Sequence, residues 1–210
     1  MRIERIEASK HKRGRVLVFL EDGACLKITE QELLDFGLRA GDELVEETLT
    51  ALKKAAGVSN VKVTAADLVG KRAMSRRDLE RKLQDKGASE AEARYAAEWL
   101  EAIGAIDDGD YAALLVRHYG NMGYGPAYVR QKLYEKGVPR DLWEDALDAL
   151  PDGEAAIDRY LAGKLQGKNP DPKEKKRLTD ALLRRGFSWG DVKAGWNRLG
   201  AEAGEDSEWN

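Results

Sequence analysis

Three glycines at nearly equal intervals constrain the fold of this chain more than any other feature. Gly87, Gly137 and Gly186 lie 50 and 49 residues apart. Each follows two apolar residues spaced four apart, which share one face of a helix, and glycine is favoured in the left-handed position just beyond a helix end. The apolar pairs are Leu79 and Leu83, Val129 and Leu133, and Leu178 and Leu182. The pattern therefore predicts a helical hairpin that occurs three times.

The second helix of each hairpin has a recognisable start. Ser89 with Glu92, and Ser188 with Asp191, fit the capping-box pattern, in which the side chain of each residue accepts a hydrogen bond from the backbone amide of the other. Pro139 suits the first helical turn, where its missing N–H leaves no hydrogen bond unmade. All three hairpins are thus predicted to have a second helix.

A further helix is predicted after each of the first two hairpins, beginning at Asp107 and at Asp152. The fold class is therefore mainly α, with tandem three-helix repeats of which the third is shorter. Such repeats stack because one amphipathic hairpin cannot bury its own apolar stripe, and the stack predicts a curved, elongated rod. The predicted bounds are residues 64–120, 121–168 and 169–200, followed by an acidic, disordered tail at residues 201–210.

Residues 1–63 predict a small α+β domain that precedes the repeats and contains a β-hairpin. Two β-prone runs flank Asp22 and Gly23, a pair that tolerates the positive φ of a tight primed turn. The expected helices are one that begins at a capping box of Thr29 and Glu32 and ends near Gly37, and one at residues 48–56.

The composition favours a cytoplasmic protein. No run approaches the roughly 20 apolar residues that a transmembrane helix needs, and the first residues alternate in charge where a signal peptide would be apolar. Cys25 is the only cysteine, which excludes an intrachain disulfide and suits a reducing compartment. A membrane partner is therefore not expected.

Charge is partitioned between the helices of the hairpins. The first helices, residues 75–86, 126–136 and 172–185, carry net charges of +2, +2 and +4, whereas the second carry −3, −3 and +1. A helix-turn-helix transcription regulator reads DNA with its second helix, and two of these three would be repelled. Stacked first helices could instead follow a phosphate backbone or an acidic protein groove without reading sequence. The DNA-binding regulator remains the alternative interpretation.

No catalytic site, metal site or cofactor is predicted, and an enzyme is not expected. His11 and His118 fall in different predicted domains, so they indicate no shared active site. The acidic residues after Asp107 resemble a calcium loop, but His118 stands where the closing glutamate should be, which favours helix capping. Residues 163–168 are one residue short of a phosphate-binding loop and follow a predicted helix where that loop requires a strand.

Several motifs resemble those of the RecX family. Residues 74–87 resemble its first-repeat pattern of Ser, acidic-Leu, Lys-Leu and Lys-Gly, residues 106–112 its apolar-Asp-Asp and Tyr-Ala element, and residues 123–137 its second repeat. The resemblance covers about residues 64–165, and the linker at residues 169–172 departs from the family pattern. It implies a monomer that binds RecA–DNA filaments and inhibits the RecA ATPase, strand exchange and filament extension. The implied partners are the RecA filament and single- or double-stranded DNA without strong sequence preference.

The candidate interaction surface follows from the basic first helices and the joints beside them. Among the aromatic residues, Tyr124 is expected to be exposed in a glycine-rich joint, whereas Tyr95, Trp99, Trp143 and Trp196 fit the buried side of the second helices. The candidate residues are Arg76, Arg77, Arg81 and Lys82 in the first repeat, Arg117, Tyr124, Arg130 and Lys132 around the second, and Lys176, Arg177 and Arg184 in the third.

Overall fold

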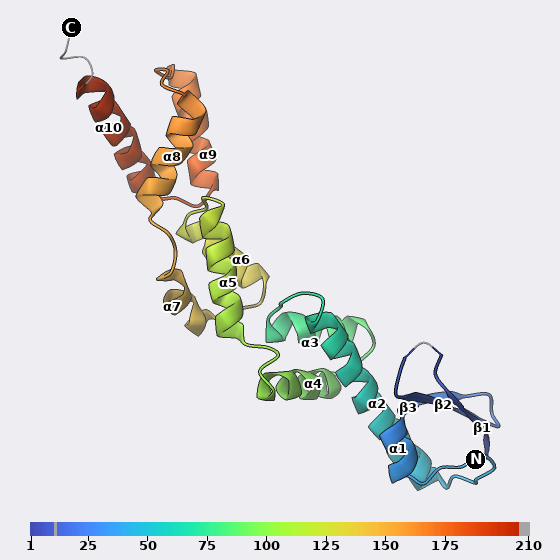
Figure 1. Ribbon diagram of the computed structural model, residues 1–210. Coiled ribbons are helices and arrows are strands. Elements are labelled where there is room, and N and C mark those ends of the chain that lie inside the picture. Colours follow the sequence, from blue (N-terminus) through green and yellow to red (C-terminus); the bar gives the residue numbers. More distant parts are fainter. Residues whose placement is uncertain (11, 206–210) are drawn as a thin grey trace. The chain divides into compact units, whose positions relative to one another are not determined.

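The computed structural model describes residues 1–10 and 12–205, with side chains through Gly200. The fold is mainly helical, as predicted, and begins with a three-stranded antiparallel sheet, of which the sequence predicted the two-stranded hairpin (Figure 1). The chain divides into two compact units, Met1–Ile106 and Asp107–Asn210. The curved rod stays a prediction.

The sheet consists of β1 (Ile3–Ala8), β2 (Arg15–Leu20) and β3 (Cys25–Thr29) in the order β1-β2-β3. The predicted hairpin is present between β2 and β3. Gly23 has a φ of 84°, and the Leu20 amide donates to the Ala24 carbonyl at 2.9 Å. Only the glycine adopts a positive φ, so the turn is a three-residue loop and not the predicted two-residue primed turn.

Two helices follow the sheet. α1 (Glu30–Asp35) begins at the predicted capping box, where the Glu32 amide donates to Thr29 Oγ1 at 3.0 Å. α2 (Glu46–Val69) is much longer than the predicted helix at residues 48–56, and it crosses the expected domain boundary at residue 63. Its interior glycine, Gly57, does not end the helix. The parts of α2 before and after Gly57 each pack into a hydrophobic core, which offsets the roughly 1 kcal/mol that a helical glycine costs.

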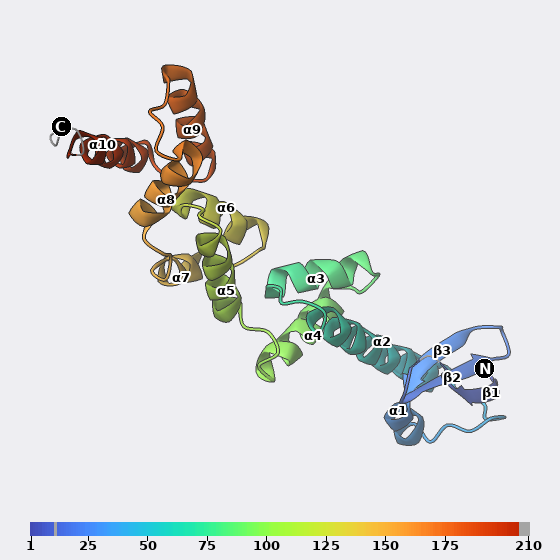
Figure 2. The ribbon, with the colours of Figure 1, turned by 45° about the horizontal axis from the view of Figure 1, so that its top comes forward.

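α2 runs from the sheet to the first helical hairpin (Figure 2) and contributes to two hydrophobic cores. Its first half packs Leu49, Leu52 and Ala56 against the sheet. Its second half packs Ala65, with partly buried Val61, against α3 (Arg76–Asp85) and α4 (Glu90–Ala102). The N-terminal sheet and the first helical hairpin are therefore joined by one continuous helix within the first unit.

The second unit contains two three-helix cores. One is formed by α5 (Asp108–Asn121), α6 (Pro126–Glu135) and α7 (Trp143–Leu147), with a short 3-10 helix, η1 (Arg140–Leu142), before α7. The other is formed by α8 (Gly153–Leu165), α9 (Pro172–Arg184) and α10 (Trp189–Glu205). We call α2–α4, α5–α7 and α8–α10 the first, second and third bundles.

These bundles group the helices differently from the predicted repeats. The helices that begin at Asp107 and Asp152 were expected to close one repeat, but each packs into the following core. Buried Tyr111 and Leu115 of α5 share a core with Val129 of α6. The spacing of the glycines in the sequence gives the length of a repeat. Where a repeat begins depends on which helices pack their apolar faces together, and the sequence spacing does not show this.

The three repeat glycines adopt the predicted conformation. Gly87, Gly137 and Gly186 have φ values of 94°, 74° and 90°. In each case the amide of the next residue donates to a leucine carbonyl in the last turn of the helix, as Val138 does to Leu133 at 3.0 Å. This is the Schellman arrangement, which satisfies carbonyls that the helix end leaves unpaired.

The end of the chain differs in part from the prediction. α10 continues to Glu205, so the tail predicted to be disordered begins within a helix. Residues 206–210 lie outside the described residues.

Candidate interaction surface

Most of the candidate cations in the first bundle bind carboxylates of the same bundle. Arg76 bonds to Glu80 at 2.9 Å on its own helix, and to Glu98 and Glu101 on α4 at 3.3 and 2.7 Å. The hydrogen bond with Glu80 raises the pKa of Arg76 against the opposing effect of partial burial. Arg76 therefore holds α3 against α4, which suits a structural role better than a contact with a partner.

Asp78 in the first turn of α3 binds Arg81 and Lys82. It accepts hydrogen bonds from Arg81 at 2.5 Å and from Lys82, and Arg72 lies 3.8 Å away. Partial burial raises the pKa of Asp78, whereas the hydrogen bond with Lys82 and the positive charges of Lys82, Arg81 and Arg72 lower it. The lowering effects together are larger, so the pKa lies below the ordinary 3.8. Exposed Arg77 makes no ion pair within the described residues.

The depressed pKa of Asp78 predicts an acid-dependent loss of stability. A carboxyl with a lowered pKa in the folded state stabilises the fold above its unfolded pKa, and this contribution is lost as pH falls below about 3.8 through the folded value. We expect Asp78→Asn to be less stable at neutral pH and to lose less stability on acidification. Urea unfolding across pH values measures this. Asp85→Asn, which changes an exposed carboxylate on the same helix, is the control, and an equal acid response in both variants would contradict the prediction.

In the second bundle, only one candidate cation is exposed without an acidic partner in the described chain. Arg117 projects from α5 into solvent. Arg130 pairs with Glu144 of α7 at 3.2 Å. Lys132 pairs with Glu135 at 2.7 Å. Arg117 is therefore the candidate here whose charge is most available to a partner.

Tyr124 is not the exposed aromatic that the sequence predicted. It is partly buried against the second core, and its ring stacks on Tyr128 with centroids 4.0 Å apart. A glycine-rich joint suggested a loose loop, but the Arg185 guanidinium lies 5.1 Å from the Tyr124 ring and holds it against the neighbouring bundle. Tyr95, expected to be buried, is 48% exposed. Trp99, Trp143 and Trp196 are partly buried in the bundle cores, as predicted.

In the third bundle, α9 carries the exposed candidates. Lys176 and Arg184 are exposed and form no ion pair in the part of the chain that the structure describes. Arg177 pairs with Glu174 at 3.3 Å and is also largely exposed. The four candidates with exposed and unpaired charges are thus Arg77, Arg117, Lys176 and Arg184.

The sequence interpretation missed Arg185, which joins the second and third bundles. Its Nη1 donates to the carbonyls of Met122 and Gly123 at 3.1 and 3.3 Å, and its own carbonyl accepts from the Gly125 amide at 2.7 Å. Its guanidinium also lies 4.8 Å from the Tyr160 ring. The signal for such a role was a basic residue directly before each repeat glycine, at Lys86, Lys136 and Arg185.

The sequence motifs judged misleading have ordinary structural roles. Asp107 caps α5, since its Oδ1 accepts from the Asp110 amide at 2.8 Å. Residues 163–165 belong to α8, so the glycine-lysine motif follows no strand. Among residues 1–10 and 12–205, no group of three or more His, Cys, Asp or Glu is arranged to hold a metal ion. In the same range, none of the helices has the length and apolarity required to cross a bilayer.

Comparison with known proteins identifies the family. A relative from Pseudomonas entomophila, named regulatory protein RecX, is 32% identical over 61% of this chain and 84% of its own length. The chain belongs to the RecX family. A RecX protein from Lactobacillus delbrueckii subsp. bulgaricus is 29% identical over 98% of this chain and 78% of the relative. The relatives are named as regulatory proteins, and this chain is accordingly a RecX-type regulatory protein.

A family model and a solved structure agree with this membership. The family model described as the second three-helix domain of RecX matches residues 107–147, which include α5, α6 and α7 of the second bundle. A crystal structure of regulatory protein RecX has a TM-score of 0.67 and 26% identity, and the match covers 92% of this chain and 98% of that one. The second bundle is thus a unit that RecX proteins share, with bounds that the packing in this structure reproduces.

Proposed function

We propose that this RecX protein binds RecA filaments on DNA and inhibits the RecA ATPase, strand exchange and filament extension, and thereby modulates recombination and DNA repair. In this proposal it acts without catalysis, as a monomer in the cytoplasm. The partners are the filament protein and DNA, which the chain contacts without strong sequence preference.

The observation that carries the proposal is the recurrence of exposed, unpaired cations in all three bundles of a RecX protein. Arg77 lies in the first bundle, Arg117 in the second, and Lys176 and Arg184 in the third. A filament repeats its acidic groups along its length, so modest contacts from successive bundles act together through a high effective concentration. Because exposed charges are screened by salt, the proposed binding should weaken as ionic strength rises.

Strand exchange tests this proposal. RecA is assembled on a single strand, a fluorescently labelled homologous duplex is added, and release of the labelled strand is followed with and without the protein. We expect inhibition that grows with protein concentration and weakens with salt. Unchanged strand exchange would contradict the proposal. A discrete footprint on duplex DNA in the absence of RecA would instead favour the alternative, a helix-turn-helix-like transcription regulator.

A further inference from the structure

Trp189 at the start of α10 is exposed where a tryptophan would ordinarily be buried. Its residue surface is 63% accessible, whereas Trp99, Trp143 and Trp196 each pack against a bundle core. Burial of a large apolar side chain stabilises a fold, and this largely exposed indole contributes little of that stabilisation. A large exposed ring is therefore a candidate for contact with a ligand.

Trp189 is the first residue of α10. Ser188 and Asp191 form a capping box, in which the Asp191 amide donates to Ser188 Oγ at 3.1 Å. The inner face of the helix then carries buried Val192 and partly buried Trp196. Trp189 lies three residues before Val192, at the first position of the helix, and is not among the residues packed in that core. Exposed Lys193 lies four residues further on.

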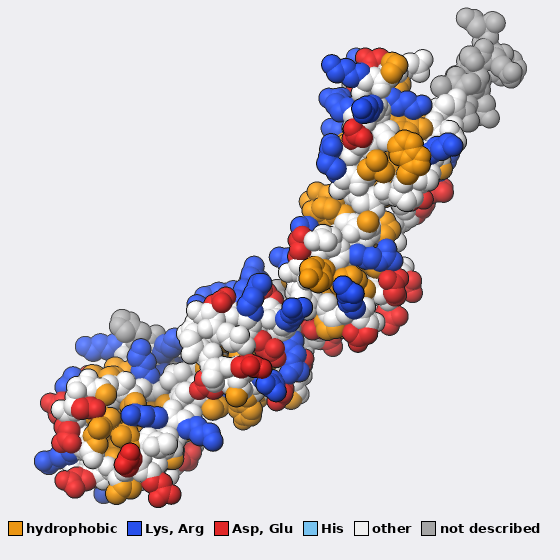
Figure 3. Space-filling model, turned by 180° about the vertical axis from the view of Figure 1, so that it is seen from behind, with side chains coloured by type: hydrophobic (Ala, Val, Ile, Leu, Met, Phe, Trp, Pro, Cys, Tyr) orange, Lys and Arg blue, Asp and Glu red, His pale blue; other side chains and the backbone are white. Residues whose placement is uncertain are grey.

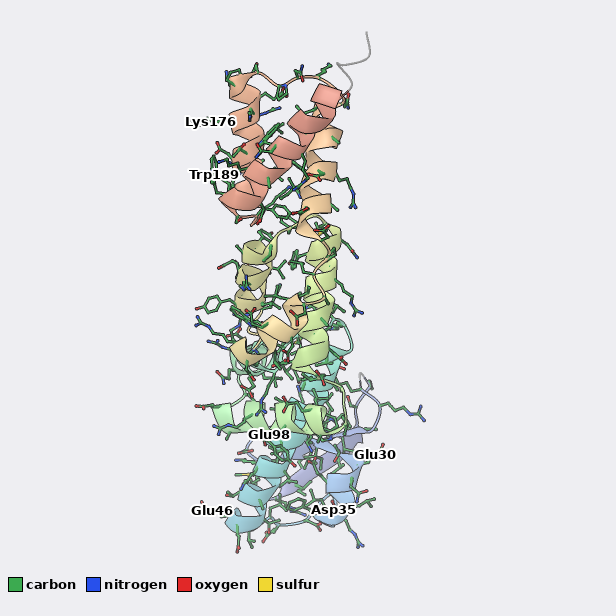
Figure 4. All side chains as sticks on the ribbon, turned by 90° about the vertical axis from the view of Figure 1, so that its left-hand side faces the viewer. Glu30, Asp35, Glu46, Glu98, Lys176 and Trp189 are labelled. Atoms are coloured by element: carbon green, nitrogen blue, oxygen red, sulfur yellow. The ribbon has the colours of Figure 1, made fainter. Side chains whose placement is uncertain are left out.

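Exposed cations lie on the neighbouring helix. Lys173, Lys176 and Arg184 are exposed on α9 and have no carboxylate partner within the described residues. α9 and α10 pack together in the third core. Figure 4 shows Lys176 and Trp189 projecting to the same side of this bundle. On that side, Figure 3 shows Lys and Arg side chains gathered beside exposed hydrophobic side chains.

The carboxylates near these cations are already engaged or partly covered. Glu174 accepts from Arg177 at 3.3 Å, and Asp191 is held in the capping box. Asp180 on α9 is half-buried. The face thus combines a positive charge with one exposed indole.

We propose that Lys173, Lys176, Arg184, Trp189 and Lys193, which we call the α9–α10 face, bind single-stranded nucleic acid without sequence preference. Lysine and arginine would contact phosphates, and the indole would stack on one base, which every base permits because each has a π face. Duplex bases already stack on their neighbours, so only an unpaired base can use Trp189. The role of this contact in filament regulation rests on the proposed function, whereas the binding is tested with the chain alone.

The first test measures binding of the full chain to a labelled oligothymidylate by fluorescence anisotropy, without RecA. We expect Trp189→Ala to weaken binding about tenfold, since stacking contributes on the order of 1–3 kcal/mol per base. Trp189→Phe should retain most of the affinity because it keeps an aromatic face. Binding to a blunt duplex should be weaker and unaffected by either variant. Circular dichroism confirms that the variants are folded.

The second test addresses the cations. Lys176→Glu with Arg184→Glu should reduce affinity for the oligothymidylate and flatten its salt dependence, because fewer counterions are released on binding. Lys53→Glu with Lys54→Glu makes the same charge change at exposed positions of α2 in the first unit and should leave binding near the wild-type level.

Three results would overturn the inference. The first is oligothymidylate binding that survives Trp189→Ala. The second is a loss of affinity in the variants that is equal for single strand and duplex. The third is a variant of this face that binds the oligonucleotide normally but no longer inhibits RecA, which would make this face a protein-binding surface. If the Trp189 dependence holds but the wild-type protein does not inhibit RecA, the inference stands and the proposed function fails.

Discussion

Replacement of Gly186 by alanine is expected to destabilise the second unit by about 3 kcal/mol, combining left-handed strain with overpacking. Gly186 has a φ of +90°, a conformation that a residue with a Cβ adopts only at a cost. A Cβ at this position would lie 2.2 Å from the Tyr128 backbone nitrogen and 2.7 Å from the Tyr128 Cβ. A backbone atom cannot rotate away as a side chain can, so the two helices must separate.

That separation would disturb the whole junction between the second and third bundles. A Cβ on Gly125 would likewise lie 2.6 Å from the Gly186 carbonyl oxygen, so the two glycine backbones are in direct contact. The Ala127 amide donates to the Gly186 carbonyl at 3.2 Å, and Arg185 bonds to two carbonyls of the preceding joint. Loss of these bonds should accompany the steric clash.

Gly87→Ala is a matched control because Gly87 occupies the same repeat position. Its φ is +94°, but a Cβ there would have no atom within 4 Å. We expect a loss of only about 1 kcal/mol from conformational strain. Urea unfolding followed by circular dichroism compares the two variants. Equal losses would show that the close contact at Gly186 adds nothing to the cost.

A second large effect is expected when the four exposed, unpaired candidate cations are reversed together. Arg77→Glu, Arg117→Glu, Lys176→Glu and Arg184→Glu should raise the protein concentration for half-inhibition of RecA by about tenfold or more, because favourable contacts with acidic groups become repulsive. None of these side chains forms an ion pair within the described residues, so the fold should be little affected. Inhibition assays and circular dichroism measure the two effects separately.

The control for this variant has the same change in net charge at other exposed positions. It combines Arg39→Glu, Lys53→Glu, Lys54→Glu and Arg159→Glu. If the control loses inhibition equally, net charge and not position is responsible. If the test variant inhibits as well as wild type, the four candidates do not form the interaction surface.

Local features of the fold could be predicted from the sequence, because they depend on residues close together in the chain. The helix-end glycines, the capping boxes at Thr29 and Ser89, and the hairpin around Gly23 are all such features. The length of α2 was missed because the packing that supports the helix comes from β3 and α4, which are distant in the sequence.

The candidate surface was less predictable than the fold. Arg76 looked like a free cation, yet its partners Glu98 and Glu101 come from α4 and meet it only after the hairpin has folded. Net charge along a helix cannot reveal such pairs. The exposure of Trp189 could not be predicted, because it lies three residues before Val192 and seven before Trp196 and so fits their apolar spacing.

The DNA-dependent ATPase of RecA is the most direct measurement of the central claim, which is that this RecX protein restrains RecA filaments. RecA and single-stranded DNA are held constant while the protein is titrated at low and at high salt. We predict that ATP hydrolysis falls with increasing protein and that more protein is required at high salt. An ATPase rate that stays constant at every protein concentration would contradict the claim.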